Sequence, residues 1–160
     1  MTEIIKTEHA PAAIGPYSQG VKAGGMVYTA GQIPLNPRTG EIAQGGICGQ
    51  AQQCLENLQQ VLAAAGSGLD RVVKTTVFIK NMSEFAQANE VYARYFSGSR
   101  LPARLALGLA ARRFAAPEFP GSLGILVGPQ PAPGPSGTGF QPQQGAVVEV
   151  LAIGPGHPGT

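Results

Sequence analysis

The chain has 160 residues, with 11 basic and 9 acidic side chains and a formal net charge of +2. This length suits one ordinary domain and is too short for two well-filled ones. The charges are interspersed along the chain, which argues against the clustered basic surface of a nucleic-acid-binding protein. No apolar run approaches the roughly 20 residues of a membrane span, and the N-terminus lacks the pattern of a secretory signal. We therefore expect a cytoplasmic protein, with an organellar pool also compatible with the sequence.

Strand patterns dominate the N-terminal part of the chain. Two short strands are predicted at Tyr17–Ala23 and Met26–Ala30, joined at Gly24-Gly25, a pair that tolerates the positive φ angles of a tight hairpin. Asn36–Gly40 has the composition of a turn. The clearest helix pattern then covers Ile47–Ala65, where apolar side chains follow one helix face and amide side chains the other.

Strands and a second helix alternate in the rest of the sequence. Gly66 suits a left-handed cap at the end of the first helix. β-branched residues predict a strand at Arg71–Lys80, and a second helix is expected over Ser83–Phe96, with its first serine as N-cap. The last strands are predicted at Ala103–Leu109 and Ala146–Ile153, which completes the order β-β-α-β-α-β-β.

This order predicts an α+β fold, in which a mixed sheet with a hairpin at each end carries two helices on one face. Two helices cannot cover both faces of such a sheet. We therefore expect the free face to contact identical chains in a homo-oligomer.

Cysteine and histidine offer no obvious chemistry in this sequence. Cys48 and Cys54 match neither a CxxC redox pair nor a zinc spacing, and in a helix they would point in different directions, so we expect no disulfide. His9 and His157 lie near opposite ends of the chain. No metal site, Ser-His-Asp triad or Cys-His pair is therefore predicted.

Three polar residues stand out because their neighbours are apolar. Arg104 follows Pro102-Ala103, Glu149 lies within Val147–Val150, and Tyr17 follows Ile14-Gly15-Pro16. Charges in apolar strands tend to be partnered or functional. An arginine fork suits a carboxylate or phosphate ligand, and a glutamate can polarise a water molecule. The alternative is that Arg104 and Glu149 pair with each other across adjacent strands.

Several motifs occur in a characteristic order along the first two thirds of the chain: Ala10–Gly20, Gly31–Pro34 followed by Asn36-Pro37 and Thr39-Gly40, Val73–Phe78, and Phe85 through Asn89 to Tyr92. Together they resemble the RidA/YjgF family of enamine and imine deaminases, from about residue 2 to Arg104. The resemblance implies a chorismate-mutase-like α+β fold, assembled as a homotrimer with active sites in the clefts between chains.

The same resemblance implies a chemical activity. Family members hydrolyse reactive 2-imino acids such as 2-iminopropanoate and 2-iminobutanoate, or their enamine tautomers, to 2-keto acids and ammonia. This hydrolase activity detoxifies reactive intermediates and needs no cofactor or metal. The expected partners are therefore a small imino acid and two further copies of the chain, with no membrane or nucleic acid.

Site residues follow from the resemblance position by position. Arg104 would bind the substrate carboxylate, and Glu149 would position the water that attacks the imine carbon. Neighbouring chains would complete the pocket with Tyr17, a further catalytic residue, the Gly31 backbone and Asn89. Ala30 occupies a position before Gly31 where a small hydroxyl residue is often found, which would weaken contacts to substrate or water.

The sequence departs from the family after Arg104. Glu149 lies 45 positions further on, about thirty more than in the family, because a Pro/Gly-rich insertion occupies approximately residues 112–144. We expect a single domain at 1–153, with this insertion, and an extended tail at 154–160. The insertion is either a tolerated surface loop between two paired strands, which we favour, or a disruption of the final hairpin.

Other functions compete with the deaminase. A trimer with an altered site could bind small carboxylates or other metabolites without turnover. Relatives have also been described as endoribonucleases, translation inhibitors or holdase-like chaperones, and the near-neutral charge counts against RNA binding.

Overall fold

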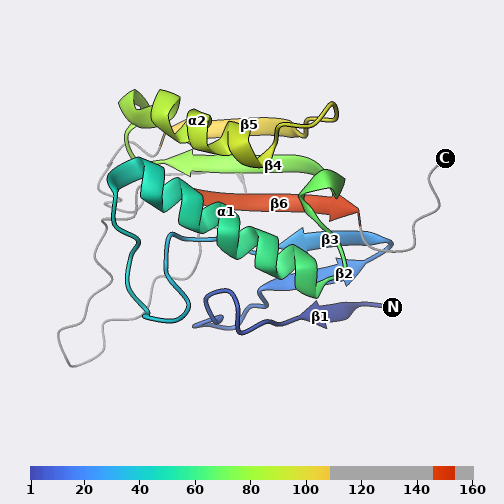
Figure 1. Cartoon of the computed structure of the whole chain (residues 1–160). Coiled ribbons are helices and arrows are strands. Elements are labelled where there is room, and N and C mark those ends of the chain that lie inside the picture. The colour runs from blue at the N-terminus through green and yellow to red at the C-terminus, as the bar shows by residue number, and fades with distance from the viewer. Residues whose placement is uncertain (109–145, 154–160) are drawn as a thin grey trace, which may run out of the picture.

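The computed structural model describes residues 1–108 and 146–153. Short 3-10 turns at Leu69–Arg71 and Met82–Glu84 precede the fourth strand and the second helix. The strands and α-helices follow one another along the chain (Figure 1) as β1 (Glu3–Ile5), β2 (Gly20–Ala23), β3 (Met26–Thr29), α1 (Gly46–Ala64), β4 (Val72–Ile79), α2 (Phe85–Tyr95), β5 (Ala103–Gly108) and β6 (Ala146–Ile153).

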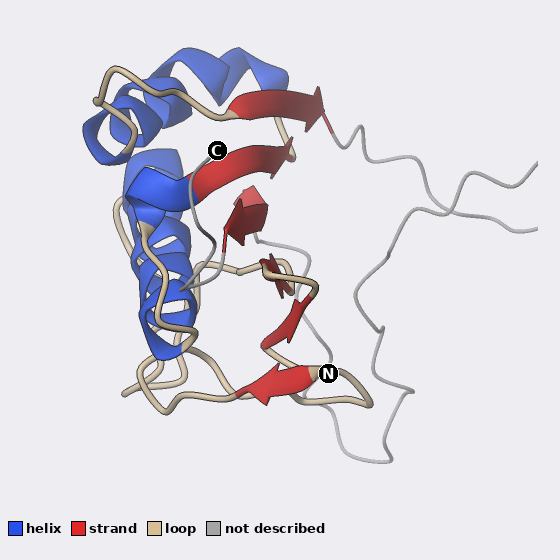
Figure 2. Cartoon of the chain, turned by 90° about the vertical axis from the view of Figure 1, so that its right-hand side faces the viewer, coloured by secondary structure: helices blue, strands red, loops and turns tan. Residues whose placement is uncertain are grey.

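All described strands belong to one mixed sheet in the order β1-β2-β3-β6-β4-β5. β4 and β5 are parallel, and the other neighbouring pairs are antiparallel. Both α-helices pack on the same face of this sheet (Figure 2), as the sequence predicted. Within the described residues, no helix is long and apolar enough to cross a membrane.

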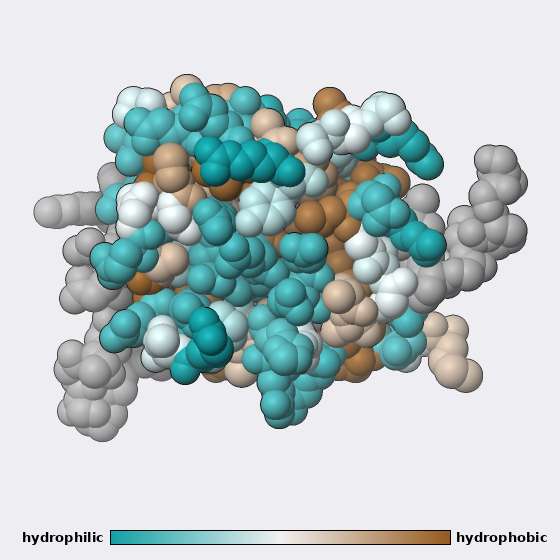
Figure 3. Space-filling model, in the orientation of Figure 1, coloured by the Kyte–Doolittle hydropathy of each residue, from teal (hydrophilic) through white to brown (hydrophobic). Residues whose placement is uncertain are grey.

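Helix α1 covers the sheet with one apolar face. Its Leu55, Leu58 and Leu62 are at most 1% exposed, and buried Val27 and Ile79 of the sheet belong to the same core. Burying a leucine side chain of this kind stabilises a fold by about 1.5–3 kcal/mol. The opposite side of the helix layer is mostly hydrophilic (Figure 3). The predicted division of α1 into a core face and a solvent face is thus confirmed.

Glycines make the turns that their positions predict. Gly24 and Gly25 have φ angles of 56° and 76° and close the hairpin between β2 and β3. Gly66 has a φ of 71° and donates its N–H to the Ala63 carbonyl, and the N–H of Ser67 donates to the Leu62 carbonyl, both at 2.9 Å. These two bonds form a Schellman cap, which satisfies carbonyls that the end of α1 leaves open.

The structure adds one strand and corrects two local predictions. Strand β1 was not predicted, because in three residues only Ile5 is buried and no alternation can be recognised. β2 begins at Gly20 instead of Tyr17, since the N–H of Tyr17 donates to the Gly15 carbonyl in a tight turn. Ser83 is not an N-cap: it lies in the 3-10 turn, and its N–H donates to the side chain of Asn81.

The last two strands do not form the expected hairpin. β5 and β6 lie on opposite sides of β4, because α2 returns the chain to the start of β4 and lets β5 run parallel to it. β6 then pairs antiparallel with both β3 and β4 at the centre of the sheet. The predicted insertion at about 112–144 and the tail at 154–160 lie outside the described residues.

Candidate active site

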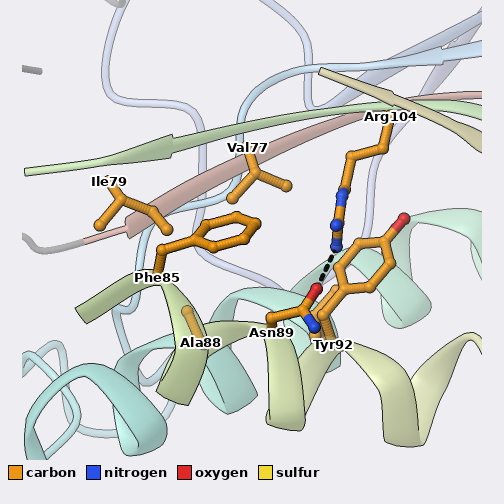
Figure 4. A pocket seen from close by; sticks show the side chains of 9 residues that line it. Val77, Ile79, Phe85, Ala88, Asn89, Tyr92 and Arg104 are labelled. Atoms are coloured by element: carbon orange, nitrogen blue, oxygen red, sulfur yellow. Dashed lines mark hydrogen bonds between the residues drawn. The ribbon is translucent and has the colours of Figure 1, made fainter. Parts of the chain in front are cut away.

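Arg104 lies at the centre of the candidate site. It is the second residue of β5, in register with Thr75 of β4, and its side chain extends toward α2 (Figure 4). There its Nη1 donates a hydrogen bond of 2.6 Å to Oδ1 of Asn89. The structure thus brings together two of the residues that the sequence nominated, and one of them orients the other.

Two aromatic rings of α2 flank the same guanidinium. Its central carbon lies 4.7 Å from the ring centroid of Tyr92 and 5.4 Å from that of Phe85. Phe85, Asn89 and Tyr92 are spaced i, i+4 and i+7, so they share one face of the helix. Cation–π contacts of this kind attract an arginine without consuming its N–H donors. The sequence motif contains both rings, but it gave no indication that they contact Arg104.

A small recess adjoins Arg104 beneath these rings. Its free volume is about 20 Å³, enough for about one water molecule. The polar groups at the recess come from Arg104, Asn89 and Tyr92, and the other walls are apolar, formed by Ala51, Leu55, Val77, Ile79, Phe85 and Ala88. A three- or four-carbon acid does not fit such a space, so the recess of one chain is at most part of a substrate site.

Glu149 occupies a different register position. It lies in β6 opposite Thr76, whereas Arg104 lies in β5 opposite Thr75. Thr75 and Thr76 are consecutive and belong to opposite faces of β4. The two strands are also separated by β4, so the alternative that Arg104 and Glu149 pair across adjacent strands is wrong.

The other nominated residues lie around the N-terminal end of the sheet. Tyr17 is 41% exposed in the turn before β2. Ala30 directly follows β3, with its N–H donating to the Gln19 carbonyl at 2.9 Å, and Gly31 comes next. None of these residues lines the recess beside Arg104. The described part of one chain therefore presents two separate groups of nominated residues.

Gln19 is a structural residue that the sequence analysis did not single out. It is 4% exposed. Its Oε1 accepts from the Thr7 N–H at 2.7 Å, and its Nε2 donates to the carbonyls of Thr7, Ala10 and Pro11 at 2.8 to 3.2 Å. A buried amide with this many bonds fixes the segment that leads to Tyr17.

Gln19→Leu is expected to lower the free energy of unfolding by about 2 kcal/mol, because the variant leaves partly buried backbone groups without their partner. Urea unfolding followed by circular dichroism measures the change. Gln60→Leu, at an exposed position of α1, is the matched control and should unfold within about 0.5 kcal/mol of wild type. Equal midpoints for the two variants would contradict the anchoring role.

The two cysteines of α1 lie in different environments, although the helix pattern suggested a core or partly buried position for both. Cys48 is exposed and Cys54 is fully buried, and the two do not form a disulfide. Burial raises the pKa of the Cys54 thiol far above its ordinary value, so this residue does not supply a thiolate nucleophile. In the described part of the chain, no three His, Cys, Asp or Glu side chains gather as a metal site would require.

Thiol labelling checks this difference in environment. Ellman's reagent is expected to modify one thiol per native chain and a second only after unfolding in denaturant. A Cys48→Ser variant should show no reaction in its native state. Rapid modification of that variant under native conditions would show that Cys54 is accessible.

Comparison with known proteins identifies the family. The model of the family described as Endoribonuclease L-PSP matches residues 7–116. The chain belongs to this family, also called YjgF/RidA. The resemblance recognised in the sequence is thereby confirmed.

Curated relatives within this family carry related names. The chain is 54% identical to a RutC family protein of Pyrococcus horikoshii, over 67% of this chain and 84% of the relative. It is 48% identical to the 2-iminobutanoate/2-iminopropanoate deaminase of Mus musculus, over 68% of this chain and 80% of the mouse protein. The deaminase of the same name from Escherichia coli K12 is 46% identical, over 69% and 87% of the two chains.

Solved structures of the family share the fold. RidA from an Antarctic Psychrobacter species superimposes with a TM-score of 0.72 and 31% identity, covering 94% of this chain and 98% of that one. E. coli TdcF, crystallised with bound serine, has a TM-score of 0.72 and 34% identity with the same coverage. The mixed α+β architecture with two helices is therefore that of the RidA proteins.

Proposed function

We propose that this protein is a hydrolase that deaminates 2-iminopropanoate and 2-iminobutanoate to 2-keto acids and ammonia. The observation that carries the proposal is the guanidinium of Arg104, a group suited to binding a carboxylate, which Asn89 and Tyr92 hold in place. The chain is also 46–48% identical to deaminases of these compounds. The other four N–H donors of this arginine are not used by Asn89. They can form the bidentate pair that a substrate carboxylate accepts.

The proposed reaction needs orientation and one activated water. With its carboxylate bound by Arg104, the substrate presents an imine carbon that is electrophilic once its nitrogen is protonated. Glu149 accepts a proton from the attacking water, whose oxygen adds to this carbon. A proton passes to the amino nitrogen, the C–N bond breaks, and ammonia leaves as the carbonyl forms. Positioning of the substrate and general base catalysis are sufficient for such a reaction without any cofactor.

We further propose that the complete site lies between chains of a chorismate-mutase-like homotrimer. The register positions of Arg104 and Glu149 belong to opposite faces of β4, which favours a site that combines Arg104 of one chain with Glu149 of another. The recess of one chain is also too small for the substrate.

The free face of the sheet supports self-association. Three apolar side chains belong to this face: Tyr28 of β3 and Leu105 and Leu107 of β5, which are 50%, 45% and 41% exposed. Each alternates along its strand with residues that face the helices, so each belongs to the opposite face of the sheet. Apolar side chains exposed on the uncovered face of a sheet are available for burial against another chain. A trimer would bury them and bring the Tyr17, Ala30 and Gly31 group of one chain toward the Arg104 recess of its neighbour.

Within that cleft, the remaining residues would take secondary roles. Tyr17 and the Gly31 backbone would contact the substrate, with Ala30 supplying no hydroxyl. Asn89 would hold Arg104 through its Oδ1 and offer its amide nitrogen to the substrate. We propose a single domain over 1–153 for this enzyme, with the segment at about 112–144 as a tolerated insertion and 154–160 as a tail.

The direct test supplies 2-iminopropanoate in situ from serine by a dehydratase and measures ammonia and pyruvate. Addition of the purified protein should raise the rate above uncatalysed hydrolysis. TdcF with bound serine favours a second candidate, binding of small carboxylates without turnover. Calorimetric binding of 2-oxobutanoate with no acceleration of hydrolysis would select this second function.

A further inference from the structure

We propose that Tyr92 and Thr75 form a positioning pair that orients Arg104 for its carboxylate ligand. The inference rests on the proposed function and deepens it, because it assigns two residues that act on the ligand only through the arginine. The juxtaposition spans three elements: Thr75 on β4, Tyr92 on α2 and Arg104 on β5.

The first step is the fixation of the Tyr92 ring. Its hydroxyl lies 2.8 Å from Oγ1 of Thr75, whose side chain is fully buried in the sheet. The ring also stacks on Phe96, with centroids 4.5 Å apart and planes inclined by 30°. A hydroxyl bond at one end and a stacked ring along one side leave Tyr92 little freedom to rotate.

The second step is the transfer of this order to Arg104. Arg104 is the register partner of Thr75 on the neighbouring strand, so its side chain starts beside the partly buried pair of hydroxyl groups. Its guanidinium lies closer to Tyr92, at 4.7 Å, than to Phe85, at 5.4 Å. Asn89 then fixes the guanidinium edge through Nη1. Figure 4 shows Tyr92 and Asn89 on the same side of Arg104.

The physical benefit is preorganisation. An arginine on an exposed strand samples many rotamers, and ordering it when the ligand arrives weakens binding. A guanidinium already held against a fixed ring binds a planar carboxylate with less loss of entropy. Burial also raises the pKa of Tyr92, so its phenol stays neutral at physiological pH, in keeping with a hydroxyl that bonds Thr75.

The experiment removes the two hydroxyl groups singly and together, in Tyr92→Phe, Thr75→Val and the double variant. Tyr92→Phe keeps the ring but releases it from the strand. Each variant is expected to raise KM for 2-iminobutanoate, and Kd for 2-oxobutanoate measured by calorimetry, by about fivefold, with kcat within about twofold. The double variant should bind 2-oxobutanoate no more weakly than the weaker-binding single variant, because the two hydroxyl groups form one hydrogen bond with each other.

Tyr95→Phe is the matched control. It lies on the same helix, and its hydroxyl contacts Glu56 at 3.5 Å instead of Thr75. This variant should keep the wild-type KM and Kd. Nuclear magnetic resonance provides a second readout: the order parameter of the Arg104 Nε–H should fall in Tyr92→Phe and stay unchanged in Tyr95→Phe.

A purely structural role of the pair would give a different pattern. Tyr92→Phe would then lower Tm while leaving Kd and the Arg104 order parameter as in wild type, which would overturn the proposal. Failure of the proposed function is distinguishable, since a wild type without deaminase activity still reports the pair through the order parameter and Kd for 2-oxobutanoate. If Arg104→Ala abolishes 2-oxobutanoate binding and Tyr92→Phe leaves it unchanged, only the positioning pair is refuted.

Discussion

Replacing Arg104 by alanine is expected to lower kcat/KM for 2-iminopropanoate by about 10²- to 10³-fold. The variant removes the charged fork that would bind the substrate carboxylate, together with its contacts to Asn89 and the two aromatic rings. Arg104→Lys should recover only part of this loss, because an ammonium keeps the charge but cannot form a bidentate pair or stack like a guanidinium. A coupled assay of ammonia release measures kcat/KM for wild type, Arg104→Ala and Arg104→Lys.

Arg100→Ala is the control for this prediction. Arg100 is also exposed and lies only four residues earlier, before β5. The control removes the same charge from the chain without touching the recess, so its kcat/KM should remain within about twofold of wild type. A loss of activity in the control that equals that of Arg104→Ala would indicate a general effect of net charge and would remove the case for a specific carboxylate site.

Glu149→Gln is expected to lower kcat by about 10²- to 10⁴-fold, the range that a general base contributes. The stronger test combines two inactive variants. If each site uses Arg104 of one chain and Glu149 of its neighbour, then Arg104→Ala and Glu149→Gln chains mixed as monomers and reassembled in equal amounts should regain activity. About a quarter of the sites in random trimers would then carry both wild-type residues.

The mixing experiment also has a clear negative result. Sites formed within single chains cannot be rescued, so the mixture would stay as inactive as its components. The control mixes each variant with itself through the same dissociation and reassembly, and sedimentation equilibrium checks that all samples are trimers. Activity of Glu149→Gln equal to wild type would show that this glutamate is not the base, whatever the assembly.

Local patterns in the sequence predicted most individual elements. Helix and strand periodicity depend on neighbouring residues, so each of these elements could be recognised from its own segment. Examples are the apolar stripe of α1, the glycine pair between β2 and β3, and the β-branched run of β4. The cap at Gly66 was readable for the same reason. β1 carried too little pattern to be found, and the exact start of α2 depended on a side-chain bond of Asn81.

The candidate site could be predicted only residue by residue. Arg104 was conspicuous as a charge in an apolar strand, and Asn89 followed from the family motif. Their contact was not predictable, because it requires α2 to lie over β5 at one particular register. The cation–π contacts of Phe85 and Tyr92 depend on the same packing.

Apart from β1, the sequence by itself determined the kinds of elements, their order and the family of this protein. Only the tertiary structure decided that β5 and β6 flank β4, that Arg104 lies in register with Thr75, and that Glu149 lies in register with Thr76. The physical reason is that strand order and register arise from pairing between distant segments, which the local alternation of side chains does not encode.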